Sequence, residues 1–179
     1  GMTVNGTNLG AGATIIGNNG YATNETFASR HGIHATATNH YQAQSLFVSH
    51  TASAVAYTVN VRVFNYGVAL RYELTGATAK TVTAEATGFV LPAGSTVWFQ
   101  GGASVYEGMF GSATISSLVT NATLGPPVTV QLAGTNVWVA ISQANLGAFP
   151  NPYLIKTAAA PGRELQVAYP TNQDGSVGA

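Results

Sequence analysis

The side chains that could carry acid–base or metal chemistry are few. The acids are Glu25, Glu73, Glu85, Glu107, Glu164 and Asp174, and the histidines are His31, His34, His40 and His50. Glycoside hydrolysis needs two carboxylates held about 5 to 9.5 Å apart, and no two of these acids are close in the sequence. Glu73 and Glu85 stand in alternating segments, so we expect both to face solvent from a strand.

The histidines do not form a recognisable metal motif. His31 and His34 are close enough to suggest a site, but no third ligand follows at a known spacing. Loop or surface histidines are the simpler interpretation. The sequence also lacks cysteine, and it contains no G-x-S-x-G elbow, Walker motif or G-x-G-x-x-G. The residues therefore indicate no catalytic group and no metal ligand.

Aromatic and amide side chains offer more. The second half of the chain gathers Trp98, Phe99, Tyr106, Trp138, Phe149 and Tyr153. Aromatic faces stack on the C–H surfaces of sugars, and amides hydrogen-bond to hydroxyls, so this neutral composition is compatible with a carbohydrate ligand. The simpler alternative for each tryptophan is that it fills a β-sandwich core.

Gln143 is ambiguous in the same way. It stands in the stretch VWVAISQANLGAF, at residues 137–149, where an apolar run ends in polar residues. It is either a strand-end amide facing water or a hydrogen-bonding residue in a binding site, and both interpretations remain open.

Composition limits the partners. The 179 residues suit one domain, the net charge is zero, and 7% of residues are charged, against roughly 25% in soluble domains. Phosphate binding needs clustered Lys and Arg, so we expect no nucleic acid partner. The longest apolar run is too short for a transmembrane helix, so we expect no membrane partner. Polarity carried by Thr, Asn, Ser and Gln is typical of extracellular or periplasmic β proteins.

The elements that must position these residues are strands. Residues 54–64 alternate, with Val55, Tyr57, Val59, Val61 and Val63 on one face, which predicts a strand with one buried face. Residues 65–67 then predict a turn in which Gly67 can adopt a positive φ, and residues 68–74 return as the second strand of a hairpin.

We expect further strands at 41–49, 80–86, 95–100, 127–133, 136–142, 153–158 and 163–169. This spacing predicts an all-β, antiparallel sandwich or barrel. Its expected parts are a weakly patterned segment at 1–30 that holds edge strands or loops, a sandwich at 31–169 and a tail at 170–179.

Three stretches together resemble a known family: residues 57–74, 89–110 and 137–155. The first carries the pattern R-x-[FY]-x-x-G-[VA]-A-[FL]-R-Y at Arg62, Phe64, Gly67, Val68, Ala69, Leu70, Arg71 and Tyr72. Tyr106–Glu107 resembles a Tyr-Glu pair that follows the family's Trp-containing strand. The chain is thereby similar, from about Arg30 to Tyr169, to the N-terminal domain of family 97 glycoside hydrolases. That resemblance implies a β-super-sandwich of the galactose mutarotase type, packed in the family against a catalytic (β/α)₈ barrel.

The sequence departs from the family in two ways. A chain of this length has no room for a barrel of about 250 residues, so we expect no enzyme in this chain. The family's T-E-A-x-L strand end, whose Glu resembles a calcium ligand, reads Ser142-Gln143-Ala144-Asn145-Leu146. Calcium favours several oxygens, above all carboxylates. We therefore expect no cofactor, calcium being retained only if a family-type site survives.

The sequence thus predicts a non-catalytic carbohydrate-binding or scaffolding domain. The expected ligand-binding residues are Gln143, Asn145, Trp98, Tyr106 and Glu107, with a catalytic barrel as partner if the chain is a fragment. The alternative is an assembly or surface-interaction β-sandwich without a sugar ligand, which would form a homo-oligomer because no lysine-rich edge protects its strands. A third interpretation, sugar epimerisation by His31, His34 or His40 with Glu107, has no motif behind it.

Overall fold

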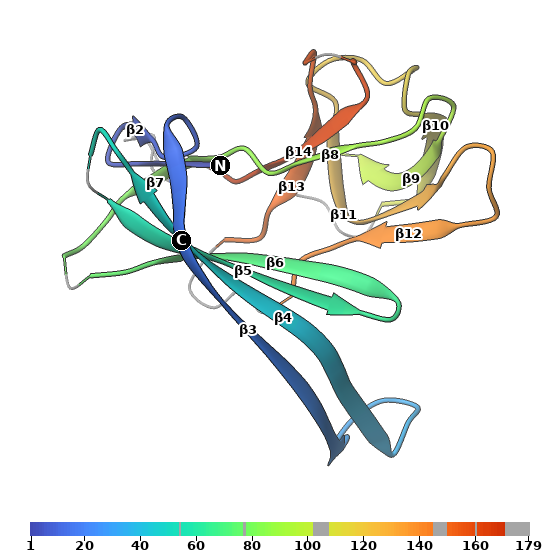
Figure 1. Cartoon of the computed structure of the whole chain (residues 1–179). Coiled ribbons are helices and arrows are strands. Elements are labelled where there is room, and N and C mark those ends of the chain that lie inside the picture. Colours follow the sequence, from blue (N-terminus) through green and yellow to red (C-terminus); the bar gives the residue numbers. More distant parts are fainter. Residues whose placement is uncertain (54, 77, 102–107, 145–149, 160, 171–179) are drawn as a thin grey trace. The chain divides into compact units, whose positions relative to one another are not determined.

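The computed structural model describes residues 1–53, 55–76, 78–101, 108–144, 150–159 and 161–170. Its regular elements are all strands, paired antiparallel, which confirms the predicted all-β antiparallel sandwich class (Figure 1). Across these described residues, no helix is long and apolar enough to cross a membrane. The chain divides into two compact units: the first is Gly1–Asn8 with Lys80–Ala179, and the second is Leu9–Ala79.

The described residues of the first unit contain ten strands in two sheets. In one sheet the order is β2-β1-β7; in the other it is β10-β9-β11-β13-β14-β8, with β12 also paired to β11. The strands are β1 (Met2–Val4), β2 (Thr7–Asn8), β7 (Val82–Glu85), β8 (Gly88–Val90), β9 (Thr96–Gly101), β10 (Gly111–Thr114), β11 (Thr123–Gln131), β12 (Trp138–Ile141), β13 (Tyr153–Lys156) and β14 (Glu164–Ala168).

The core of this unit lies on one face of the larger sheet. Val97 in β9 is fully buried and pairs with Val130 of β11, which is also fully buried. Because side chains alternate along a strand, their neighbours Trp98 and Thr129 lie on the opposite face. The apolar cluster that holds Val97 and Val130 also contains Leu91, Ile115, Leu124, Val128, Ile141, Leu154 and Leu165.

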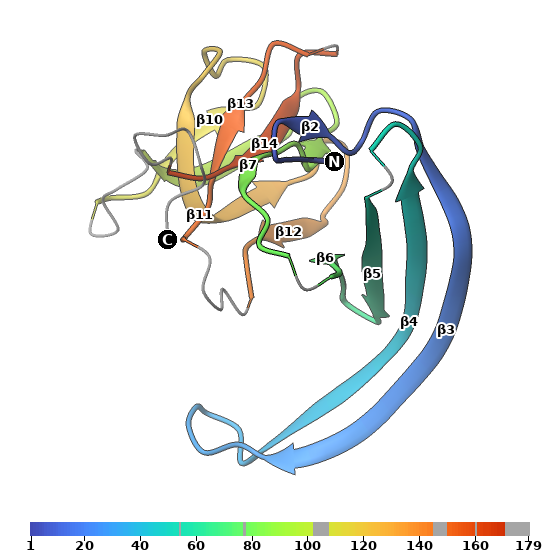
Figure 2. The same ribbon diagram turned by 90° about the vertical axis from the view of Figure 1, so that its left-hand side faces the viewer.

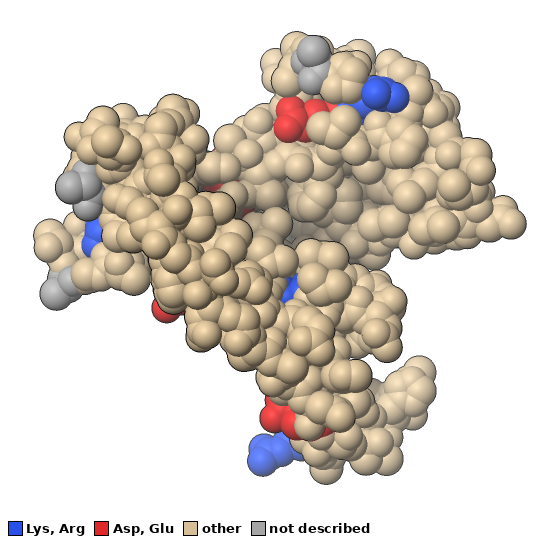
Figure 3. All heavy atoms as spheres, in the orientation of Figure 1, with Lys and Arg blue, Asp and Glu red and all other residues tan. Residues whose placement is uncertain are grey.

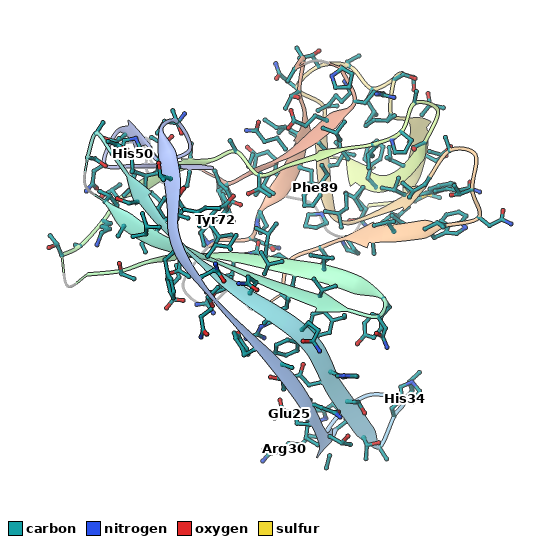
Figure 4. The ribbon with its side chains drawn as sticks, viewed as in Figure 1. Glu25, Arg30, His34, His50, Tyr72 and Phe89 are labelled. Carbon is teal, nitrogen blue, oxygen red and sulfur yellow. The ribbon has the colours of Figure 1, made fainter. Side chains whose placement is uncertain are left out.

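The second unit is a four-stranded sheet in the order β3-β4-β5-β6. Its strands are β3 (Ala13–Ala28), β4 (Thr36–His50), β5 (Ala56–Phe64) and β6 (Gly67–Leu74). β4 pairs with β3 along its whole length, but it pairs with β5 only over residues 42–49. The rest of β3 and β4 is therefore a curved two-stranded ribbon (Figure 2). Figure 4 places Glu25, Arg30 and His34 at the tip of this ribbon and His50 at the other end of β4.

An aromatic strip joins the ribbon to β5. It consists of Tyr21, Tyr41, Phe64 and Tyr66, whose neighbouring ring centroids are 6.2, 5.3 and 6.0 Å apart. The Arg62 guanidinium lies 4.6 Å from the centre of the Tyr41 ring, within the range of a cation–π contact. Tyr41 is consequently only 6% exposed. A two-stranded ribbon is marginally stable alone, so this packing stabilises its base.

The predicted hairpin is confirmed, because β5 pairs with β6 from Tyr57↔Leu74 to Phe64↔Gly67. One detail of its turn was wrong. Gly67 begins β6 and does not have a positive φ, so Asn65 and Tyr66 alone connect the strands. Burial also declines along the apolar face of β5, from Tyr57, which is 6% exposed, to Val63, which is 49% exposed.

The seven further predicted strands correspond to β4, β7, β9, β11, β12, β13 and β14. β3 occupies most of the weakly patterned first thirty residues and forms an edge of its sheet. Prediction missed β8 and β10, which have only three and four residues.

Candidate functional site

A polar cluster forms in the first unit where three strands end. Glu85 is the last residue of β7, Tyr169 directly follows β14, and Gln143 follows β12 by two residues. The Tyr169 hydroxyl donates to Glu85 Oε2 over 3.0 Å, and Thr87 Oγ1 donates to Glu85 Oε1 over 2.6 Å. Both oxygens of this carboxylate are therefore engaged.

Backbone pairing holds the cluster together. Met2 of β1 pairs with Glu85, and Gly88 of β8 pairs with Gln166 of β14. The Val167 amide also donates to the Thr87 carbonyl over 2.8 Å. These contacts fix the segment after β7 against β14. The Glu85 carboxylate at the end of β7 therefore meets the Tyr169 phenol just after β14.

Gln143 completes the cluster but leaves one atom unsatisfied. Its side-chain amide hydrogen-bonds to Tyr169, whereas its Oε1 is buried and has no hydrogen-bond partner among the described residues. A buried acceptor without a donor costs about 1 to 3 kcal/mol. The Gln143 Oε1 is therefore an acceptor of this cluster whose hydrogen bond is not made among the described residues.

The cluster keeps the phenol protonated. Burial raises the pKa of Tyr169 well above its usual value of 10.0, and the Glu85 carboxylate raises the pKa further through its charge and its hydrogen bond. The Gln143 amide acts in the opposite direction, because it donates to the phenol oxygen. Tyr169 thus serves as a hydrogen-bond donor at neutral pH and not as a base.

A hollow of about 180 Å³ lies beside these groups. It is lined by Thr83, Ala84, Glu85, Gln166, Val167, Ala168 and Tyr169. Drug-sized ligand pockets have volumes of about 300 Å³ or more. This hollow has room for part of a small polar ligand at most.

The two tryptophans meet elsewhere in the same unit. Trp98 lies in β9 and Trp138 in β12, and their ring centroids are 4.9 Å apart with planes tilted by 37°. Trp138 is 54% exposed, and Trp98 is half-buried. The alternative in which each ring fills the core was therefore wrong, because both rings lie on the face of the sheet opposite the buried cluster.

Two of the five predicted binding residues fall within the described part of the chain. Gln143 contacts Tyr169, and Trp98 contacts Trp138. Asn145, Tyr106 and Glu107 lie outside the described residues.

Glu85, Tyr169 and Trp138 were not among the residues predicted from the sequence to bind a ligand. Glu85 was expected on a solvent-facing side, but it is half-buried and bonded to Thr87 and Tyr169. The alternation of residues along 80–86 predicts which face of the strand carries Glu85. It does not predict which other strand ends beside that residue. The pairing of β7 with β1 and the return of β14 supply that information.

The described residues do not fit a calcium ion. Calcium takes six to eight oxygen ligands. In the described part of the chain, no three His, Asp or Glu side chains converge on one point. Both Glu85 oxygens already accept hydrogen bonds, and the Gln143 Oε1, which has no hydrogen-bond partner among the described residues, carries no charge.

A comparison with models of known protein families shows which family the chain belongs to. Residues 1–172 match the family model described as "Glycosyl-hydrolase 97 N-terminal". The chain belongs to this family. The match spans nearly the whole sequence, which confirms and extends the resemblance that began at about Arg30. No curated protein matches the chain.

Solved structures share the fold of this domain at low identity. A family 97 glycoside hydrolase from Pseudoalteromonas sp. strain K8, in complex with acarbose, has a TM-score of 0.81 and 18% identity over 92% of this chain and 25% of that chain. A variant of that enzyme in complex with panose aligns with the same values. A beta-arabinopyranosidase has a TM-score of 0.83 and 18% identity, covering 100% of this chain and 32% of that chain. The domain therefore spans a quarter to a third of these enzymes.

Proposed function

We propose that this chain is a non-catalytic domain that holds carbohydrate for a glycoside hydrolase. The observation that carries the proposal is the family match over residues 1–172, in a chain that spans 25% of a family 97 enzyme. The similar enzymes from Pseudoalteromonas sp. strain K8 bind acarbose and panose. We extend that class of ligand, an oligosaccharide, to this domain, and we take a catalytic barrel as its partner.

Gln143 supplies the directed contact in this proposal. Its buried Oε1 lacks a donor among the described residues, and a sugar hydroxyl is a neutral donor that would satisfy it. Glu85 and Tyr169 act as positioning residues, because the phenol that Glu85 holds in turn fixes the Gln143 amide. Ligand-binding roles for Trp98, Asn145, Tyr106 and Glu107 stay predictions.

Calorimetric titration of the 179-residue chain with panose and maltotriose tests this function. Gln143→Ala removes one hydrogen bond of about 1 to 1.5 kcal/mol, so the Kd is expected to rise roughly tenfold. Gln42→Ala is the matched control, because Gln42 is an exposed amide in the second unit. Absence of any heat with either sugar, or equal Kd values for the Gln143→Ala and parent chains, would contradict the proposal.

The protein would work outside the cytoplasm, in an extracellular or periplasmic space where polysaccharide is available. The low charge and the abundance of Thr, Asn, Ser and Gln support this location. Fractionation of the native host, with detection of the full polypeptide by antibody, tests it.

A second function, assembly without a sugar ligand, is favoured by β3. This sixteen-residue edge strand carries one charged side chain, Glu25, and no lysine or proline. Natural edge strands usually carry such residues to prevent pairing with another chain. Oligomers that form in the absence of any glycan affinity would favour this function.

A further inference from the structure

The two tryptophans form a single exposed feature. Trp98 and Trp138 are the only two tryptophans of the sequence, yet they come from strands separated by β11. Trp98 pairs with Thr129 and Trp138 pairs with Gln131, so the two side chains stand on opposite sides of β11 and on the same face. Their centroids lie 4.9 Å apart, which requires the rings to lean toward each other over β11.

The core does not require this pair. Val97 and Val130 are fully buried on the other face of the same strands, and the apolar cluster contains neither tryptophan. Trp138 leaves 54% of its surface exposed. Large apolar rings held at the surface and outside the core are a common mark of a binding surface.

The surroundings of the pair are polar but neutral. On the same face, the register places Thr96, Ser112, Thr129 and Gln131 beside the rings. Between Glu85 and Lys156 the sequence has a single charged residue, Glu107. In Figure 3 the charged atoms are correspondingly confined to a few isolated spots. A surface without charge is complementary to a neutral ligand, and its hydroxyl and amide groups suit a ligand rich in hydroxyls.

We propose that Trp98 and Trp138 form a two-ring platform that binds a pyranose ring of a neutral oligosaccharide. One face of the sugar, where C–H bonds project, lies on the exposed Trp138 ring, and Trp98 supports Trp138 from the side. The neighbouring threonine, serine and glutamine side chains hydrogen-bond to the equatorial hydroxyls. This inference rests on the proposed carbohydrate function. It adds a second contact surface, separate from the cluster of Gln143, Glu85, Thr87 and Tyr169.

Tryptophan fluorescence, excited selectively over that of the tyrosines, reports on this platform directly, since Trp98 and Trp138 are the two tryptophans of the sequence. In the free chain, acrylamide is expected to quench part of the emission, because Trp138 is exposed. Panose should reduce that quenching and shift the emission to shorter wavelength. Trp138→Ala should raise the calorimetric Kd for panose about tenfold or more, and Trp138→Phe should have an intermediate Kd. Val119→Ala is the control, because Val119 is 73% exposed in the same unit.

Three results would overturn the platform. The first is full protection of both tryptophans from acrylamide in the sugar-free chain, since another part of the protein would then cover them. The second is an emission spectrum unchanged by panose and maltotriose at about 10 mM, well above a millimolar Kd. The third is calorimetric binding that Trp138→Ala leaves intact in a chain with an unchanged circular dichroism spectrum. In the third case the carbohydrate function would stand, with its ligand bound elsewhere.

Discussion

At the scale of single residues, the cluster of Gln143, Glu85, Thr87 and Tyr169 depends on an uncharged side chain at position 143. Glu85 is already a carboxylate in a half-buried place, held by Thr87 and Tyr169. A neutral amide at Gln143 can donate to the Tyr169 oxygen without repelling that carboxylate. The uncharged side chain therefore fits this cluster for an electrostatic reason, independent of any ligand.

Gln143→Glu tests this reasoning. The Glu85 carboxylate should raise the pKa of the introduced glutamate above its usual value, because a neighbouring negative charge disfavours a second one. A raised pKa means that stability is present at low pH and is lost as the pH rises through the folded-state value. We expect a loss of about 1 kcal/mol at pH 7, corresponding to a shift of roughly one pKa unit, and a smaller loss at pH 4.

Urea unfolding at both pH values measures this difference. Gln42→Glu is the control, because it adds the same charge at an exposed position of the second unit. An equal loss of stability at pH 4 and pH 7 would contradict the electrostatic explanation and indicate a steric one.

Tyr169→Phe tests the protonated phenol. Since the pKa of Tyr169 is raised in the folded state, the unfolded chain loses this proton first, and the free energy of unfolding falls as the pH rises above about 10. Tyr169→Phe should make that fall shallower. A remainder should persist, because burial and the neighbouring Tyr72 also raise the pKa of Tyr57. Denaturant titrations between pH 9 and pH 11 measure the slope, and an identical slope in both chains would exclude this role.

At the scale of elements, alternation predicts strands well and their surroundings poorly. The pattern in residues 54–64 predicted β5 and its hairpin partner, because period two leaves little choice of structure. β3 was expected only as edge strands or loops within residues 1–30, because its sequence, ATIIGNNGYATNETFA, contains the turn-forming run Gly17–Gly20. Pairing with β4 over its whole length overrides that local preference. The same limit explains the site: Gln143 was proposed from its motif, whereas Glu85 and Tyr169 meet only through the order of the strands.

The aromatic strip gives an element-scale prediction. Tyr41 is nearly buried among Tyr21, Phe64 and Arg62, and truncating a buried aromatic ring to Ala costs about 3 to 5 kcal/mol. Tyr41→Ala should therefore destabilise the second unit by about 3 kcal/mol and expose the ribbon to hydrogen exchange.

Amide exchange in residues 20–28 and 36–43 measures that loss of protection. Tyr66→Ala is the control within the same strip, because Tyr66 is 86% exposed and contacts only Phe64 among the described rings. Exchange rates in the ribbon that stay unchanged in Tyr41→Ala would show that backbone pairing with β4 suffices to hold it.

At the scale of the whole molecule, the low charge sets how strongly copies of the chain repel one another. Six basic and six acidic residues give no net charge at pH 7, and the pI is 7.1. Near the pI, electrostatic repulsion between copies is minimal, so any exposed strand edge can make contact. β3 offers sixteen residues with the single charge of Glu25. If the chain self-associates at neutral pH, two causes can be separated: the absence of electrostatic repulsion and the unprotected edge of β3.

Ala22→Lys separates these causes. Ala22 is exposed in β3, and a lysine there disfavours pairing with a second chain at that edge. Light scattering at pH 7 should show smaller particles for Ala22→Lys than for the parent chain if edge pairing drives association. Thr135→Lys adds the same charge at an exposed position of the first unit. If both variants dissociate equally, net charge is the cause and β3 has no specific part. If Ala22→Lys alone dissociates and panose binding is unaffected, edge pairing and carbohydrate binding are independent properties of the domain.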